Sequence, residues 1–582
     1  MDNTNKKNNV VLESFIFPTR HLPPCFTNEL LFNKLPEIYD EYLDLNEILN
    51  ENFVFNGKKI TDFKGYNDNI YGLKKGVEPL NFNISKPNGA NRIMTVANPL
   101  VLIPLHFYII DNNIEILAEQ SNENEKFLSS SKYFFEQGFI FRNFDDYENF
   151  EWETYTNIVQ SNYKSTLLNK QKISNGKYYH LSIDISNFFN NIYTHTISWN
   201  LVNDRNKHIF DNMDILNRTL NCNETKGLVI GPYTSSLFSE IILSKIDNLI
   251  LPFCEEKDVS YTRFCDDFDF YCDSKDILSN ETIIFISEQL SRFKLDLNMN
   301  KLKLEEFPFV SLNTIQNKSL FLLLKRLEEN SYENSLELVE DIINEINNSI
   351  KIKYSNCNYL LTILTSLFSS DKVNDILIDS DSAEVLLDYL VNMFFKQNMI
   401  TKAACNFILC LFNVVDVDKE KMLIKWIKKR NARENYIKEI TEVWLSYLII
   451  KLNLQNDIFD TYMLSMLNKS TLGANLSMEY FWCNSLIVKY KSEIKSYLKK
   501  IKEELLTRFD SNWKQAGYYT KYWMLFYTNC VRWKIHEEKG FGDTIFYNMV
   551  INDLIHNDST LEKKLNLLNK LYEKNVEFLT FD

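Results

Sequence analysis

Two adjacent aspartates between aromatic residues are the side chains of this sequence best suited to bind a metal ion. Asp266 and Asp267 lie in the segment 261–271, whose two strand-like arms predict a β-hairpin with both carboxylates at its tip. Adjacent carboxylates repel each other, and their desolvation beside aromatic rings is costly unless a cation compensates. A polar hairpin turn would explain an isolated pair of this kind, because aspartate is a common turn residue.

A third aspartate, Asp184, ends the strand-like run 178–185, which continues into two phenylalanines. Alone it would be interpreted as a helix cap. One strand-end aspartate and a hairpin pair about eighty residues later can instead present three carboxylates to two divalent metal ions. Hard oxygen ligands and phosphate chemistry favour Mg²⁺. We therefore expect Asp184, Asp266 and Asp267 to be catalytic residues that bind two Mg²⁺ ions.

Three further segments contain residues that could contact a triphosphate. Lys86 and Arg92 bracket a predicted basic hairpin, Gly231 and Pro232 lead into a helix, and Lys301 follows a helical run. Each segment has a simpler structural explanation by itself: a solvated turn, a helix start and a helix-terminal cap. Their order along the chain, together with the aspartates, favours a shared site.

That order resembles the finger and palm motifs of reverse transcriptases. The sequence from Phe264 to Asp267 is similar to their Y-x-D-D box, with Phe in place of Tyr. Phe189 occupies the position at which this family places an aromatic side chain to exclude a ribose 2′-hydroxyl, which implies deoxynucleotide substrates. We also expect Ile185, which follows Asp184, to be a substrate-binding residue, and an aromatic strand at 307–309.

A closer resemblance, carried by the segments 181–199 and 298–309, is to the abortive-infection reverse transcriptases of bacteria, the AbiK and AbiA group of phage-defence proteins. Its most specific part is the Y-T-H-x-x-x-W extension from Tyr193 to Trp199, which we expect to buttress the palm helix or line the nucleotide pocket. The resemblance implies template-independent DNA synthesis from a hydroxyl of the protein itself, with the DNA product left covalently attached. It also implies a homo-oligomer.

The priming hydroxyl in that group is commonly a tyrosine. Tyr39 and Tyr42 near the N-terminus and the pair Tyr518 and Tyr519 are candidates among the 31 tyrosines, although ordinary packing explains each of them. Some AbiA relatives carry a nuclease-like R-x(4–6)-H element. The nearest approach here, R-W-K-I-H at 532–536, is one residue too short, so we expect no nuclease.

The distribution of helix and strand breakers divides the 582 residues into regions of different architecture. All 11 prolines lie at or before Pro308, and no glycine occurs between Gly231 and Gly473. Apolar residues after Pro308 recur at spacings of three and four, which is typical of one helix face. We expect an N-terminal extension at 1–60, an α+β palm and fingers domain at 61–310, and an all-α helical, HEAT-like domain at 311–582. Within the second region, 80–110 reads as strand and loop, because four prolines and glycines interrupt it.

Composition excludes several other classes. The net charge of −14 argues against a wholly nucleic-acid-binding surface, so phosphate binding must rely on local basic groups or cations. The ten cysteines form no C-x-x-C pair, which argues against structural zinc. No apolar run suits a signal peptide or membrane helix, so a cytoplasmic protein with reduced thiols is expected.

Two alternatives remain open at this stage. The first is template-directed reverse transcription from a bound RNA. The second is a non-catalytic defence scaffold, in which the helical array binds another protein.

Overall fold

The computed structural model describes fourteen segments of the chain. The residues between these segments are not described. These segments are 14–41, 76–85, 91–112, 168, 170–199, 207–309, 318–329, 332–352, 354–369, 378–396, 401–431, 439–509, 517–538 and 566–581.

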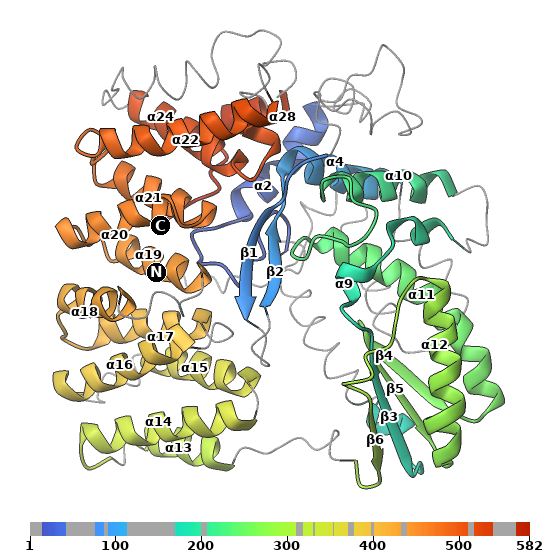
Figure 1. The fold of residues 1–582 in the computed structure, drawn as a ribbon. Helices are drawn as coiled ribbons and strands as arrows, with labels where there is room; N and C mark the ends of the chain where they lie inside the picture. Colours follow the sequence, from blue (N-terminus) through green and yellow to red (C-terminus); the bar gives the residue numbers. More distant parts are fainter. Residues whose placement is uncertain are drawn as a thin grey trace, which may run out of the picture.

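A four-stranded antiparallel sheet forms the palm, with strand order β4-β5-β3-β6 (Figure 1). The strands are β3 (Tyr179–Asp184), β4 (Ser260–Phe264), β5 (Asp267–Cys272) and β6 (Lys303–Glu306). Helices α11 (Tyr233–Glu256) and α12 (Ile283–Arg292) pack together and cover one face of this sheet. Shorter elements complete the region: α9 (Phe188–Asn191), η2 (Thr194–Ser198), α10 (Lys207–Thr219) and η4 (Ile277–Thr282).

Side-chain alternation explains how the palm sheet separates core from site. Leu181 and Ile183 of β3 and Phe268 and Phe270 of β5 are fully or almost fully buried. Their neighbours along each strand, which include Asp184, Asp267 and Asp269, point to the opposite face because successive strand residues alternate. The α+β pattern predicted for this region is confirmed, and its acidic residues gather on one face of the sheet.

The predicted aromatic strand at 307–309 is wrong in its position. β6 ends at Glu306, and Phe307 and Pro308 follow it as irregular chain. Proline has no N–H to give to a strand pair, so the run of β-forming residues cannot continue through it.

The fingers region begins with an antiparallel hairpin of β1 (Leu80–Ser85) and β2 (Asn91–Val96). These strands confirm the predicted hairpin, although its turn at 86–90, with Lys86, lies outside the described residues. The following segment corrects our expectation of strand and loop, because α4 (Pro99–Asp111) is a helix that contains Pro104. Proline is well suited to the first helical position, and burial on all sides hides the apolar periodicity that reveals a surface helix.

The C-terminal region is helical in every described segment except its last residues. Its helices are α13 (Lys318–Glu328), α14 (Ser335–Ile352), α15 (Tyr354–Phe368), α16 (Ser380–Lys396), α17 (Thr401–Val414), α18 (Lys419–Asn431), α19 (Glu439–Lys451), α20 (Asp457–Leu467), α21 (Thr471–Cys483), α22 (Lys491–Phe509), α24 (Trp523–Glu538) and α28 (Asn566–Glu573).

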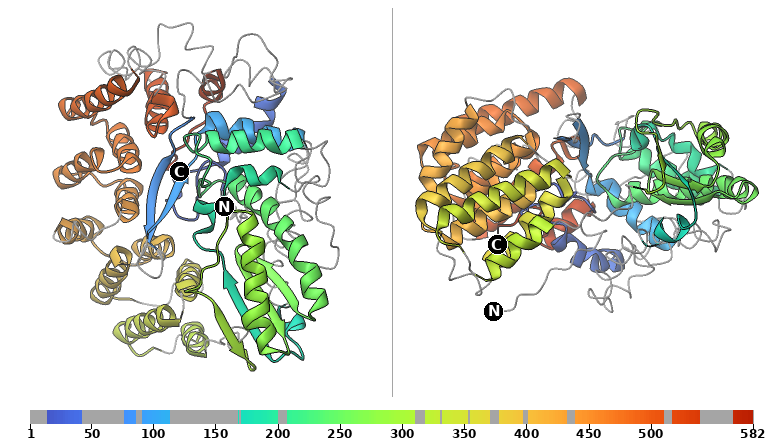
Figure 2. Two further views of the ribbon diagram at one scale, coloured as in Figure 1. Left: turned by 45° about the vertical axis from the view of Figure 1, so that its right-hand side comes forward. Right: turned by 90° about the horizontal axis from the view of Figure 1, so that it is seen from below.

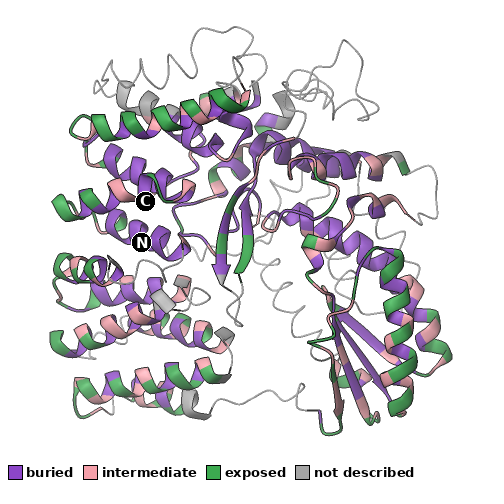
Figure 3. Cartoon of the chain, viewed as in Figure 1, coloured by how far each residue is buried: buried purple, intermediate pink, exposed green. Residues whose placement is uncertain are grey.

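These helices stack in two rows (Figures 1 and 2). One row contains α15, α17, α19 and α21, each in contact with the next, and α14, α16, α18 and α20 lie beside them. The predicted helical array is therefore confirmed as an architecture. Buried and exposed residues alternate around the helices (Figure 3), as expected where one helix face meets the neighbouring row. In the described segments no helix has both the length and the apolar character that a membrane crossing requires.

The two ends of the chain pack together between the regions. Residues 14–41, which include α2 (Glu29–Glu41), contact the palm through the stacked rings of Phe15 and Tyr233, whose centroids are 6.1 Å apart. A backbone bridge joins Phe26 to Leu579. The fingers hairpin also contacts α19. The N-terminal segment thus joins the palm, the fingers and the helical array.

Candidate active site

The register of two palm strands places the three candidate aspartates together. β3 and β5 run antiparallel, and Asp184 is the direct partner of Asp267. The backbone N–H of Ile185 donates to the carbonyl of Asp266 at 3.4 Å, which brings the end of β3 against the hairpin turn. Residues that face each other across antiparallel strands have neighbouring side chains. The three carboxylates therefore share one corner of the sheet.

The aspartate hairpin has the predicted form. Phe264 of β4 pairs with Asp267 of β5, which leaves a two-residue turn of Cys265 and Asp266. Cys265 has φ of 50°, in the left-handed region that a residue with a Cβ adopts only at some cost. This turn places Asp266 outside the strand pair, where its carboxylate interacts with the charge of Asp184.

Asp184 has two polar partners from the segment that follows α12. The Lys301 Nζ lies 2.7 Å from Asp184 Oδ2, and the Asn298 side-chain amide donates to the same oxygen at 3.0 Å. The Asn298 backbone N–H also donates to the Asp184 carbonyl at 2.8 Å. The hydrogen bond to Asp184 raises the pKa of Lys301, so the lysine carries its charge at this corner. Lys301 is 64% exposed, which leaves it free to reach a phosphate.

Burial and mutual repulsion change the acidity of the hairpin aspartates. Burial, followed by the charges of Asp267 and Asp184, raises the pKa of Asp266 to about 6. Burial and the charge of Asp184 also raise the pKa of Asp267. Carboxylates in this state gain from a nearby divalent cation, and their oxygens are the donors that Mg²⁺ prefers. The donor set therefore fits Mg²⁺.

Shared metal binding requires some side-chain movement. Within the described ranges, no group of three Asp, Glu, His or Cys side chains is arranged closely enough to hold one ion.

The raised pKa of Asp266 predicts a pH-dependent effect of Mg²⁺ on stability. In the metal-free protein the folded state holds a proton on Asp266 up to about pH 6, whereas the unfolded chain releases it near the ordinary aspartate pKa of 3.8. The free energy of unfolding should therefore fall as pH rises through this window. Mg²⁺ competes with that proton, so it should raise the melting temperature more at about pH 7.5 than at about pH 5. An equal effect at both pH values would contradict this assignment.

The predicted nucleotide loop is connected to the first aspartate motif. The Leu228 N–H donates to the carbonyl of Phe189 at 2.9 Å, and the Gly227 N–H donates to that of Ile192 at 2.8 Å. Phe189 is half-buried, and its ring meets Phe188 edge-on at 5.3 Å. Phe189 thus lies close to both the Asp184 strand and the segment that leads to Gly231. The side chain of Ile185 is buried, so this residue can meet a substrate only through its backbone.

Gly231 fixes the fingers against the start of α11. It has φ of 152°, and an added Cβ would lie 2.4 Å from the carbonyl oxygen of Thr95 in β2. The Thr95 N–H donates to the carbonyl of Ile230 at 2.7 Å. Pro232 follows as the N-cap residue of α11. The helix start that we predicted is present, and its glycine permits a backbone contact that a side chain would block.

Arg92 lies on the second strand of the predicted basic hairpin. It is exposed on β2, opposite Ile84. Burial, and then the charge of Arg92, lower the pKa of His21 to about 4. The charge of Lys301, in contrast, offsets a small part of the rise in the pKa of the two hairpin aspartates. Lys301 is the basic residue that contacts the acidic corner directly, through its ion pair with Asp184.

A fourth acid on the site's face of the sheet was missed in the sequence. Asp269 Oδ1 accepts a hydrogen bond from His180 Nε2 at 2.9 Å. Asp269 Oδ2 forms an ion pair with Lys170 Nζ at 2.5 Å. Burial alone would raise the pKa of Asp269, but these two partners outweigh it and hold the pKa below its usual value. Only the alternation of D-x-D in β5 hinted that this residue shares a face with Asp267.

The Y-T-H-x-x-x-W extension supports the palm from outside the acidic corner. His195 Nδ1 lies 2.6 Å from Asp214 of α10, and the ring of Tyr193 meets both His195 and Trp199 edge-on. Thr194 is fully buried. This packing agrees with the first of the two roles that we expected, support of a palm helix, whereas a role in lining the nucleotide pocket stays a prediction.

Comparison with known proteins agrees with this geometry. Residues 138–360, less than half of the chain, match the family model described as Reverse transcriptase (RNA-dependent DNA polymerase). A curated relative, the Retron Ec83 reverse transcriptase of Escherichia coli, is 32% identical over 118 residues. That match covers 19% of this chain and 38% of the relative, so it spans well under two thirds of that protein.

Solved structures of telomerase from two Candida species align more loosely. The Candida albicans telomerase has a TM-score of 0.27 and 11% identity over 62% of this chain and 65% of that one. The apo telomerase of Candida tropicalis has a TM-score of 0.29 and 13% identity over 72% of this chain and 74% of that one. Scores at this level do not establish a shared fold. The family match and the retron relative support a reverse-transcriptase-type domain in this chain, of the kind found in bacteria.

Proposed function

We propose that this protein is a DNA polymerase of the reverse-transcriptase type that acts in antiphage defence. It adds deoxynucleotides to a hydroxyl of the protein itself, without a nucleic-acid template, and releases pyrophosphate. The observation that supports this most is the register of β3 and β5, which brings Asp184 beside Asp267 and the Asp266 turn.

The acids have distinct roles in this proposal. Asp184 and Asp266 bind both metal ions, and Asp267 assists them. Two bound Mg²⁺ ions supply activation of the attacking hydroxyl and neutralisation of the triphosphate. Asn298 and Lys301 hold the Asp184 carboxylate in place before substrate arrives.

Basic residues and the nucleotide loop complete the substrate site. Lys301 contacts the phosphates, which its charge and exposure beside Asp184 support. Lys86 and Arg92 reach the triphosphate from the fingers hairpin, whose turn lies outside the described residues. Gly231 and Pro232 form the loop over which the nucleotide lies, together with the backbone of Ile185.

Phe189 selects the sugar in this proposal. Phe189→Ala should raise the incorporation of ribonucleotides relative to deoxynucleotides by about tenfold or more, because the ring no longer blocks a 2′-hydroxyl. Competition between labelled rATP and dATP measures this ratio. Phe188→Ala is the matched control, since its ring is buried in the core, and it should leave the ratio unchanged. Equal ratios in Phe189→Ala and the wild type would exclude this role.

Protein priming and template independence follow from the resemblance to the abortive-infection group. The net charge of −14 is compatible with an enzyme that grips no long template duplex. Among the tyrosine candidates, Tyr518 and Tyr519 are buried, which disfavours them as primers in this conformation. The side chains of Tyr39 and Tyr42 lie outside the described residues. Within the described segments, Tyr178 and Tyr359 are the most exposed tyrosines, at 63% and 62%.

Template-directed synthesis from RNA is the second candidate, because the matching family description and the retron relative both favour it. Nuclease-treated protein incubated with labelled dNTPs and Mg²⁺, with and without added RNA, separates the two. Incorporation without RNA supports our proposal, and strict dependence on RNA supports the alternative. A defence scaffold without catalysis would show no incorporation, and the double variant Asp266→Ala/Asp267→Ala would still protect cells from phage.

A further inference from the structure

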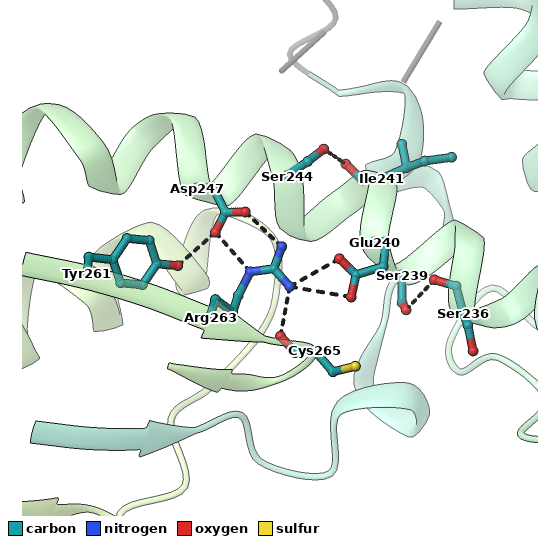
Figure 4. A network of polar contacts seen from close by, with 9 residues as sticks. All are labelled: Ser236, Ser239, Glu240, Ile241, Ser244, Asp247, Tyr261, Arg263 and Cys265. Atoms are coloured by element: carbon teal, nitrogen blue, oxygen red, sulfur yellow. Dashed lines mark hydrogen bonds and ion pairs between the residues drawn. The ribbon is translucent and has the colours of Figure 1, made fainter. Parts of the chain in front are cut away.

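A buried arginine lies directly beneath the aspartate turn, on the opposite face of the sheet from the acids. Arg263 is the fourth residue of β4 and is 0% exposed (Figure 4). Its guanidinium points toward α11, the helix that begins after Gly231 and Pro232. A buried charge of this kind requires paired and hydrogen-bonded partners.

Two acids of α11 provide those partners. Asp247 accepts from Arg263 through both oxygens, at 2.9 Å from Nε and 2.7 Å from Nη2. Glu240 accepts from Nη1 at 3.2 Å, and the Tyr261 hydroxyl donates to Asp247 at 2.7 Å. This paired geometry uses the planar fork of arginine, which a lysine cannot reproduce.

The same guanidinium also holds the turn that carries the catalytic acid. Arg263 Nη1 donates to the carbonyl oxygen of Cys265 at 2.8 Å. Cys265 is the residue with φ of 50°, a conformation that persists in a non-glycine residue only when its surroundings enforce it. Asp266 is the next residue. The peptide unit between Cys265 and Asp266 is therefore fixed from below by Arg263.

We propose that Arg263 is a positioning residue that aligns the Asp266 carboxylate with α11. The clamp formed by Arg263, Asp247, Glu240 and the Cys265 carbonyl sets the conformation of the turn, and thereby its position relative to the nucleotide loop at the start of α11. This inference rests on the proposed polymerase function, but it concerns how the site is held rather than which reaction it performs.

Kinetics of Arg263→Lys test the proposal. Lysine retains the positive charge but cannot donate to Asp247 and the Cys265 carbonyl at the same time in this geometry. The kcat for dNTP incorporation should therefore fall about tenfold to a hundredfold, while the KM for dNTP stays within about twofold. The Mg²⁺ concentration for half-maximal activity should also rise. A kcat equal to that of the wild type, measured per folded molecule, would overturn the proposal.

Arg430→Lys is the matched control, because Arg430 is also buried and donates through Nε to Glu442 at 2.7 Å. It lies in α18, within the helical array. This variant should lose stability as Arg263→Lys does, yet keep its kcat. An equal loss of kcat in both variants would show that Arg263 acts through general stability, and would count against positioning.

Hydrogen exchange provides a readout that does not depend on activity. In Arg263→Lys the peptide that spans 260–272 should exchange faster than in the wild type, while peptides of α18 to α20 should not change. Unchanged hydrogen exchange at the turn would contradict the positioning role of Arg263, even if the protein is a polymerase. If the wild type shows no incorporation but the turn loosens, the proposed function fails and the clamp stands. Should Arg263→Lys not fold, Glu240→Gln tests the same contact, with a smaller fall in kcat expected.

Discussion

Replacement of Asp266 by asparagine is expected to reduce dNTP incorporation at least about a thousandfold, since in the proposed mechanism it removes a charged ligand of both metal ions. The same substitution should stabilise the metal-free protein by about 1 kcal/mol at neutral pH. The pKa of Asp266 is raised to about 6 by burial and by its acidic neighbours, so the folded state disfavours the ionised carboxylate. Loss of activity together with a gain in melting temperature is the signature of a functional acid.

Asp273→Asn is the matched control for this substitution. Asp273 directly follows β5, is half-exposed and pairs with Lys177 at 3.4 Å, away from the aspartate turn. It should retain activity within about twofold, because an exposed ion pair contributes little. Incorporation by Asp266→Asn above about a tenth of the wild-type rate would remove Asp266 from the metal site.

Gly231→Ala is expected to lower the free energy of unfolding by about 3 kcal/mol and to abolish most activity. Two costs combine at this position. The backbone φ of 152° disfavours any residue with a Cβ, and that Cβ would overlap the Thr95 carbonyl at 2.4 Å. Relief of this overlap must shift β2 away from α11, and with it the fingers. Chemical denaturation and the dNTP assay measure the two effects.

Gly176→Ala separates the two costs. Gly176 also has a positive φ, of 79°, but nothing lies within 4 Å of its added Cβ. It should therefore show the backbone cost alone, about 1 kcal/mol, with full activity. If Gly231→Ala is no less stable than Gly176→Ala, the close contact between fingers and palm does not limit this position.

The acidic residues of the candidate site could be predicted from the sequence because each lies in a local pattern that indicates its secondary structure. The aromatic arms around Asp266 and Asp267 predict a hairpin through alternation alone, and Asp184 ends a run whose β character is strong. The long tract without proline predicted helices for the same local reason. Its successive apolar runs correspond to α14, α15, α16, α17 and α19.

The remaining features depend on long-range contacts that no local pattern encodes. The helix α4 was hidden because its prolines suggested breaks, whereas burial on all sides supports a helix there. Asn298 lay in a motif that we had marked, yet only the fold shows that it binds Asp184. The clamp around Arg263 joins strand β4 to Glu240 and Asp247 of helix α11. Because this contact depends on how the strand and the helix pack, the sequence alone could not predict it.

Mass spectrometry of the protein after incubation with Mg²⁺ and one dNTP tests the central proposal most directly. Nuclease-treated wild-type protein, without added template, should gain a covalent deoxynucleotide on one of its own hydroxyls, and peptide mapping should assign it to a single residue. Asp266→Asn should gain none, whereas Asp273→Asn should match the wild type. An unmodified wild-type protein that makes free DNA only when RNA is supplied would contradict the account.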